Sequence, residues 1–192
     1  MTRLVPLLCV VALAGCRPAD DVRTYTLPRP PADPKADPEA ATHRLLGAVI
    51  PTPDGQSLFV KLSGPIGPVS AQADAFRRFV ESMRLTGRPA EPLTFAVPPG
   101  WRPGPAKQMR LTTFLVGDGP KPLEAYVSEP FRGTLRENVN RWRKEVGAPE
   151  VTEAELPLAA PELLLGDSKA YYVDARGAGG TGGMAAPFAP RK

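Results

Sequence analysis

Few side chains in this sequence are of the types that catalyse reactions. The chain of 192 residues contains one histidine, His43, and two cysteines, Cys9 and Cys16. A His-based triad, a zinc finger and a disulfide scaffold all need more of these residues, so the composition argues against all three. The spacings of a nucleophile elbow and of a phosphate-binding loop do not occur in the sequence. We expect no cofactor and no metal ion.

Three carboxylates, Glu150, Glu153 and Glu155, form the set that acid–base chemistry would use. Paired acids hydrolyse glycosidic bonds when a cleft holds them roughly 5–9 Å apart. These three lie in a proline-flanked stretch with no second acidic group clearly opposed to them, a pattern that favours solvated charges. We therefore predict no catalytic residue and no enzyme. A cell-wall or glycan hydrolase, or an accessory enzyme using Asp/Glu chemistry, is the alternative.

Cys16 ends an apolar segment and is the most specific chemical signal in the chain. Arg3 supplies a positive start, and Leu4–Ala12 is an apolar run too short to span a bilayer. The small residues of Leu13-Ala14-Gly15-Cys16 then close it, a pattern typical of a signal peptide. This ending resembles the bacterial lipobox, whose cysteine thiol accepts acyl chains such as palmitate. We predict a signal peptide over residues 1–15 and lipidation at Cys16; the alternative is an ordinary secretory signal that ends in Cys.

The segment after Cys16 predicts a spacer. Residues 16–41 contain six prolines among Ala and Asp, a composition that cannot bury a core. Such a tether extends to roughly 75 Å at about 3.1 Å per residue. Several acyl chains on one residue anchor a protein stably, whereas a single chain binds marginally. We expect a membrane-anchored protein of the bacterial cell envelope that faces the periplasm or the exterior, with Arg17 favouring the outer membrane.

The charge distribution argues against nucleic acid as a partner. The net charge is +4, but residues 42–174 carry almost equal numbers of basic and acidic side chains. A surface that follows phosphates needs Lys and Arg clustered on the folded domain. The densest basic run, residues 141–144, is flanked by Glu137 and Glu145. We expect the membrane as a partner, and beyond it an envelope protein or a glycan.

Five side chains are candidates for a ligand or partner surface. They are Trp101, Asn138, Asn140, Arg141 and Arg143. Trp101 follows a Pro-Pro-Gly turn, where an aromatic ring is available for stacking, although such a Trp also closes the end of a sheet. The Asn and Arg side chains suit hydrogen bonds to a sugar or a carboxylate. Alternatively, they form a solvated helix face whose Asn side chains hold neighbouring loop backbone.

Hydrophobic periodicity predicts an α+β domain over residues 42–175, followed by a Gly-rich flexible tail over 176–192. Apolar residues recur every three or four positions over 69–83 and 135–146, which indicates two helices, and Thr134 and Glu137 have the spacing of a capping box. Runs rich in β-branched and aromatic residues indicate strands over 44–50, 58–62, 93–97, 109–116, 123–127 and 170–173. We expect a largely antiparallel sheet of about six strands covered by the two helices.

Several strings in this domain carry a resemblance. They are Pro98-Pro99-Gly100-Trp101, Met109-Arg110, Asn138-Val139-Asn140-Arg141-Trp142-Arg143, Gly147-Ala148-Pro149 and Thr152-Glu153-Ala154-Glu155-Leu156. The chain resembles uncharacterised bacterial envelope proteins with a P-x-G-W … M-R … N-V-N-R-W-R pattern. More distantly, the order of elements is similar to PsbP-like α/β/α sandwiches, which are binding or assembly modules. The resemblance implies a non-catalytic, lipid-anchored envelope protein, a role that the sequence does not specify further.

Overall fold

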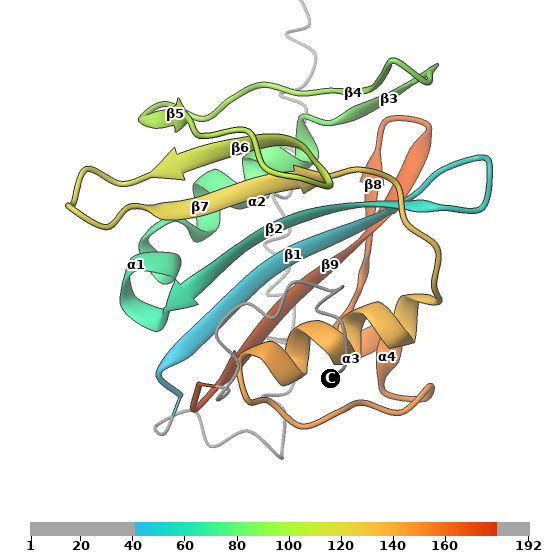
Figure 1. Cartoon of the computed structure of the whole chain (residues 1–192). Helices are drawn as coiled ribbons and strands as arrows, with labels where there is room; N and C mark the ends of the chain where they lie inside the picture. The colour runs from blue at the N-terminus through green and yellow to red at the C-terminus, as the bar shows by residue number, and fades with distance from the viewer. Residues whose placement is uncertain (1–40, 180–192) are drawn as a thin grey trace, which may run out of the picture.

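An antiparallel sheet of seven strands forms the centre of the domain (Figure 1). The structure is a computed structural model that describes residues 41–179. The strand order is β5-β6-β7-β2-β1-β9-β8, and β3 and β4 form a separate two-stranded sheet. The strands are β1 (His43–Pro51), β2 (Ser57–Pro65), β3 (Arg84–Arg88), β4 (Glu91–Thr94), β5 (Trp101–Pro103), β6 (Arg110–Val116), β7 (Leu123–Ser128), β8 (Glu162–Leu165) and β9 (Ser168–Gly177). The helices are α1 (Ile66–Ala71), α2 (Ala73–Glu81), α3 (Leu135–Glu145) and α4 (Leu156–Ala159).

The central strand β1 is covered on both faces. On one face, Leu46, Ala48 and Ile50 belong to the core beneath α1, α2 and the β3–β4 hairpin, which also contains Phe76 and Phe79. On the other face, the side chains of β1 pack beneath α3 and α4, and that core contains Leu45, Val49, Phe59, Val139, Trp142 and Val173. Successive side chains of a strand point to opposite faces of the sheet. Because successive residues of β1 are apolar, the strand contributes to both cores.

Helix α3 begins and ends where the sequence predicts. The Thr134 hydroxyl accepts from the Glu137 backbone N–H at 3.2 Å, and the Glu137 carboxylate accepts from the Thr134 N–H at 2.8 Å. This reciprocal capping box satisfies two donors at the helix start. Gly147 follows the helix with φ of 73°, a conformation that glycine adopts without steric cost.

The α+β class and the antiparallel sheet are confirmed, but the predicted element count is wrong. The sheet has seven strands rather than about six, a second small sheet is present, and four helices replace the predicted two. The apolar stripe of residues 69–83 is split into α1 and α2 at Gln72, whose φ of −103° and ψ of 2° interrupt the helical backbone. The predicted strand 93–97 ends early, at Thr94.

The two ends of the described chain meet at one end of the sheet. The backbone N–H of Thr42 donates to the carbonyl of Gly177 at 2.9 Å, and the Gly179 N–H donates to the Val146 carbonyl at 3.0 Å. Strand β9 therefore continues two residues past the predicted domain end at 175, because its backbone still has partners there. The predicted signal peptide 1–15, Cys16, the tether up to residue 40 and residues 180–192 of the tail lie outside the described residues.

We call this end of the sheet, where the Thr42 N–H bonds to the Gly177 carbonyl, the entry pole. The opposite end carries the β1–β2 turn and the β8–β9 turn, and we call it the distal pole. Antiparallel pairing fixes this arrangement, because His43 pairs with Gly177 while Val49 pairs with Tyr171. Figure 1 shows the two turns close together, away from the start of β1.

Candidate functional site

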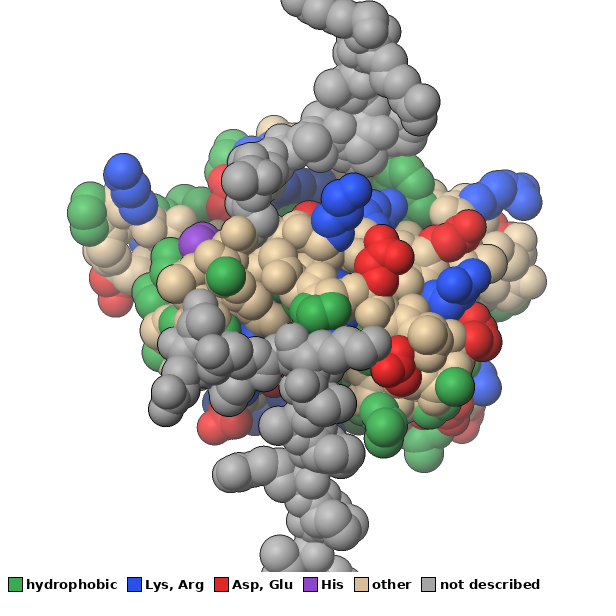
Figure 2. Space-filling model, turned by 90° about the horizontal axis from the view of Figure 1, so that it is seen from below, with side chains coloured by type: hydrophobic (Ala, Val, Ile, Leu, Met, Phe, Trp, Pro, Cys, Tyr) green, Lys and Arg blue, Asp and Glu red, His purple; other side chains and the backbone are tan. Residues whose placement is uncertain are grey.

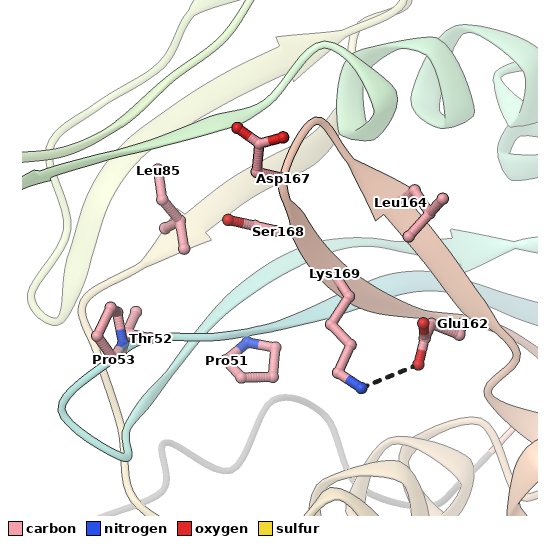
Figure 3. Close-up of a pocket in the computed structure, with 9 residues that line it drawn as sticks. All are labelled: Pro51, Thr52, Pro53, Leu85, Glu162, Leu164, Asp167, Ser168 and Lys169. Atoms are coloured by element: carbon pink, nitrogen blue, oxygen red, sulfur yellow. Dashed lines mark hydrogen bonds and ion pairs between the residues drawn. The ribbon is translucent and has the colours of Figure 1, made fainter.

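A hollow of about 420 Å³ lies at the distal pole. Its lining comes from the β1–β2 turn, from Leu85 of β3 and from the β8–β9 hairpin (Figure 3). The residues are Pro51, Thr52, Pro53, Leu85, Glu162, Leu164, Asp167, Ser168 and Lys169. Pockets for small ligands commonly span about 300–1,000 Å³, so the hollow has room for a side chain or a small ligand.

Proline at position 51 explains why the sheet opens here. The Thr52 N–H donates to the Gln56 carbonyl on the β2 side, so the alternation of an antiparallel ladder directs position 51 toward β9. Proline has no N–H, and it cannot make that bond. Pairing between β1 and β9 accordingly stops at Val49 and Tyr171, while pairing between β1 and β2 continues to Pro51. The β8–β9 hairpin is thus released from β1 and forms one wall of the hollow.

The hollow combines apolar walls with a charged rim. Leu164 is 72% exposed, although large apolar side chains are usually covered. Lys169 donates to Glu162 at 3.1 Å across the hairpin, and this contact raises the pKa of Lys169. Asp167 has no ion-pair partner within residues 41–179. The arrangement suits binding of an apolar group next to a cation.

A second, smaller hollow of about 320 Å³ lies near the entry pole. It is lined by three prolines, Pro65, Pro68 and Pro122, together with residues such as Val116 and Leu123. These come from the end of β2, from α1 and from the turn between β6 and β7. Its walls are mainly apolar and its rim carries Lys121.

Trp101 lies in the core and is 7% exposed. Its ring centroid is 5.1 Å from that of Phe79 and 6.1 Å from that of Phe114. The indole Nε1 donates to the Gln72 side chain at 3.1 Å, which satisfies the one polar atom of the ring. The ring closes an end of the sheet, and it is not displayed for ligand stacking.

Two asparagines of α3 hold backbone rather than a ligand. The Asn138 side chain donates to the Thr134 carbonyl at 2.9 Å and is buried. The Asn140 amide donates to the Val151 carbonyl at 3.0 Å and accepts from the Val151 N–H at 2.8 Å. This pair of bonds fixes the loop that follows α3, and it uses both the nitrogen and the oxygen of the Asn140 amide.

The two arginines of α3 differ in exposure. Arg143 is buried, and its guanidinium donates to the carbonyl of Pro149. Arg141 is exposed, with its guanidinium carbon 5.4 Å from the centroid of the Phe59 ring. Of the five sequence candidates, Arg141 is exposed and Asn140 is half-buried, whereas Trp101, Asn138 and Arg143 are buried.

The three carboxylates of the predicted acidic set stay on one loop. Glu150 is exposed, and Glu153 forms an ion pair with Arg136 at 2.9 Å. The Glu155 carboxylate accepts from the backbone N–H of Thr152 at 2.8 Å and from its hydroxyl at 2.9 Å. Two of the three thus serve local contacts. Figure 2 shows acidic and basic side chains interspersed on the face seen from below in Figure 1.

His43 lies at the start of β1, where the Thr42 hydroxyl is 2.9 Å from its Nδ1 atom. Within residues 41–179, no three His, Cys, Asp or Glu side chains gather closely enough to hold a metal ion.

The part of the sheet beside α3, formed by β6, β7 and β2, carries a polar network that the sequence analysis missed. The Tyr126 ring lies close to two cations, with the Arg110 guanidinium 4.0 Å and the Lys61 ammonium 5.8 Å from its centroid. Lys61 is buried and forms an ion pair with Glu145 of α3. The network links β2, β6, β7 and α3. The alternation of polar and apolar residues in β7 is the signal that indicates such a polar face.

Glu124 of β7 completes the polar network around Tyr126. Its carboxylate accepts from Lys107 at 2.7 Å and from Arg110 at 3.1 Å. Hydrogen bonding to Lys107 is the main cause that lowers the pKa of Glu124, against a smaller opposing effect of burial. The charged side chains of this network are paired with each other.

Tyr172 belongs to a second polar group, beneath α1 and α2. Arg44 donates to both carboxylate oxygens of Asp174, at 2.8 and 2.7 Å, and to the Ser70 hydroxyl at 2.9 Å. The hydrogen bond to Asp174 is the main cause that raises the pKa of Arg44. Burial, followed by the negative charge of Asp174, raises the pKa of Tyr172 to about 12.

We expect stability to fall between pH 10 and 12 because of Tyr172. The unfolded chain releases the phenol proton near pH 10, whereas the folded chain keeps it to about 12. The unfolded state therefore binds fewer protons in this window, and stability present below pH 10 is lost as the pH rises. A pKa difference of two units corresponds to a loss of at most about 2.7 kcal/mol in the free energy of unfolding. Partial exposure of the ring reduces this loss to about 2 kcal/mol. Urea unfolding at pH 9, 10 and 11 measures the slope, and Tyr172→Phe should make it shallower; equal slopes would contradict the assignment.

No helix within residues 41–179 is long and apolar enough to cross a bilayer. No family model, curated protein or solved structure matches the chain. The resemblance to bacterial envelope proteins therefore stays a prediction.

Proposed function

We propose that this chain is a lipid-anchored protein of the bacterial cell envelope whose α+β domain acts by binding. The observation that carries the proposal is the apolar segment ending in Leu13-Ala14-Gly15-Cys16, followed by a proline-rich spacer. The cysteine supplies the acyl acceptor, and the spacer supplies the distance between membrane and domain. The resemblance of the later motifs to envelope proteins agrees with this address.

The positions of the spacer and of the hollow at opposite ends of the domain support a binding role. The spacer joins the domain at the entry pole, where the Thr42 N–H bonds to the Gly177 carbonyl. The hollow lined by Pro51, Leu85 and Leu164 lies at the distal pole. Anchoring through Cys16 would hold the entry pole nearer the membrane and leave the hollow free to meet a partner across the envelope.

The hydrolase alternative has less support from the site geometry. It needs two facing acids, one of which has a raised pKa so that it can donate a proton. Glu153 and Glu155 are instead engaged in local contacts on one loop. Hydrogen bonds lower the pKa of three described acids, Asp54, Glu124 and Glu137.

Replacement of Cys16 by serine tests the anchor. Serine keeps the size of the side chain but lacks the thiol that accepts the first lipid, so we expect the variant to lose its acyl chains and leave the membrane fraction. The measurements are the intact mass of the detergent-extracted protein and its partition after an alkaline carbonate wash. Wild-type protein should show cleavage before Cys16 and a mass increase from acyl chains.

Cys9→Ser is the matched control for this experiment. Cys9 lies inside the apolar run, so its replacement leaves the Leu-Ala-Gly-Cys ending intact and should leave both mass and partition unchanged. A Cys16→Ser protein that stays fully in the membrane fraction, with the wild-type mass, would overturn the proposed anchor.

A further inference from the structure

Strand β8 ends the sheet at the distal pole. It is the last strand in the order β5-β6-β7-β2-β1-β9-β8, and β9 is its one strand neighbour in that order. A terminal strand presents backbone N–H and C=O groups that another extended chain can pair with. Within residues 41–179, Figure 1 shows no strand beyond β8.

The register of the β8–β9 hairpin identifies the outward-facing groups. Leu165 pairs with Ser168 across the two-residue turn Gly166–Asp167, and Gly166 has φ of 65°, as the first turn position of a type II′ hairpin requires. The Tyr172 N–H donates to the Pro161 carbonyl at 2.9 Å. Because hydrogen-bonded pairs alternate along an antiparallel ladder, the odd-numbered residues of β8 bond to β9. The N–H and C=O of Glu162 and Leu164 therefore point away from the sheet.

The opposite edge of the sheet is protected, unlike β8. Strand β5 has three residues, and its last residue, Pro103, has no N–H to offer. Prolines and short strands are the usual devices that prevent edge-to-edge pairing. Residues 162–165 contain no proline, and their exposed side chain at position 164 is leucine.

The exposed side chains of β8 and of the turn after it indicate what kind of chain fits. A residue hydrogen-bonded opposite Leu164 shares its face of the sheet, next to the hollow of about 420 Å³. An apolar side chain there would cover Leu164. Glu162 is already paired with Lys169, whereas Asp167 has no ion-pair partner within the described chain. A basic side chain on the added strand would supply one.

We propose that β8 is a docking edge for an extended peptide segment of a partner protein, one that alternates apolar and basic residues and adds to the sheet as an eighth strand. Backbone hydrogen bonds to Glu162 and Leu164 give the affinity, and the exposed Leu164 side chain and Asp167 select the side chains. The inference deepens the proposed function, because a binding role needs a surface, and the distal pole is the one that anchoring would leave accessible.

The test uses the full-length protein in detergent micelles and a fluorescent peptide, Lys-Val-Lys-Phe-Lys-Val-Lys, with blocked ends. Fluorescence anisotropy measures its affinity, and hydrogen exchange with mass spectrometry locates it. We expect binding that slows amide exchange in residues 162–165. A peptide with Glu in place of Lys should bind at least fivefold more weakly, because it would face Asp167 with like charge.

Leu164→Pro is the decisive variant. It removes the outward N–H of position 164 but no bond of the β8–β9 ladder, so we expect at least a tenfold loss of affinity with unchanged thermal stability. Leu164→Val is the matched control; it keeps both the N–H and an apolar side chain and should bind within about twofold of wild type. If Leu164→Pro proves unstable, a peptide N-methylated at Phe and at the two valines gives the same test on wild-type protein.

Three outcomes would overturn the inference. The first is that the peptide fails to bind at millimolar concentration. The second is that it binds Leu164→Pro as tightly as wild type. The third is that the amides it protects from exchange lie around Tyr126 on β6 and β7, or at the hollow near the entry pole. Protection of residues 162–165 that rises with protein concentration in the absence of peptide would assign the edge to a second copy of this chain instead. The assay is independent of lipidation. Peptide binding by a chain without acyl groups would refute the anchor alone, and an acylated chain that does not bind would refute the docking edge alone.

Discussion

Replacement of Gly47 by alanine is expected to destabilise the domain by about 2–3 kcal/mol, the usual cost of overpacking a tight core. A Cβ atom at position 47 would lie 2.4 Å from Cζ3 and 2.8 Å from Cε3 of Trp142. The indole cannot retreat, because it is buried and packs edge-on against Phe59 at a centroid distance of 5.6 Å. Alanine otherwise favours a strand over glycine, so the clash alone determines the sign of the effect.

Urea unfolding measures this prediction, with Gly67→Ala as the matched control. Gly67 lies in α1 with nothing within 4 Å of a Cβ, so alanine there should be neutral or stabilising by up to about 1 kcal/mol. A double-mutant cycle adds a second check: in a Trp142→Leu background, Gly47→Ala should cost less than about 1 kcal/mol. A Gly47→Ala protein as stable as wild type would mean that the Trp142 ring does not pack directly against the backbone of β1 at Gly47.

Elements with a complete periodic pattern could be predicted from the sequence. The apolar stripe of α3 runs for three turns and starts at a capping box, so its type and its ends are fixed locally. The β6–β7 hairpin is similar, since two apolar runs flank a short glycine-rich turn. In both cases the residues that form the element also carry the signal for it.

The short elements could not be predicted, because tertiary contacts decide them. Strand β8 reads Glu-Leu-Leu-Leu, a run without alternation, and Leu164 is exposed between two leucines that face the core. The one local signal is Gly166-Asp167, which suits a two-residue hairpin turn. Strand β5 has three residues and contains a proline, so its pairing with β6 gives no pattern in the sequence.

The candidate site shows the same limit. The polar face of α3 is visible in the sequence, but periodicity does not tell which part of that face a later loop will cover. The loop at Val151 returns onto Asn140, and Pro149 returns onto Arg143. The hollow at the distal pole depends on Pro51, whose missing N–H matters only because β9, more than a hundred residues later, lies beside it.

The effect of alanine at Gly177 is expected to be larger than at Gly47. A Cβ there would lie 2.2 Å from the carbonyl oxygen of Val146 and 2.8 Å from the backbone nitrogen of Ala148. These obstacles are backbone atoms rather than a side chain, and the Gly179 N–H bonds to the same Val146 carbonyl at 3.0 Å. Relief of the clash requires the end of β9 to separate from the end of α3. We expect a loss of about 3 kcal/mol or more, measured by urea unfolding.

Gly119→Ala is the matched control, since nothing lies within 4 Å of a Cβ at that exposed turn position. Two truncations test the same contacts whether or not Gly177→Ala folds. A chain that ends at Gly179 keeps the bonds from Thr42 to Gly177 and Ala178, whereas a chain that ends at Ala175 loses them together with the Gly179 bond to Val146. We expect the shorter chain to be less stable by about 2–3 kcal/mol, at about 1 kcal/mol for each lost hydrogen bond. If the two chains were equally stable, residues 176–179 would not stabilise the domain, and they would belong to the predicted tail. The close contact at Gly177 would then not require a glycine.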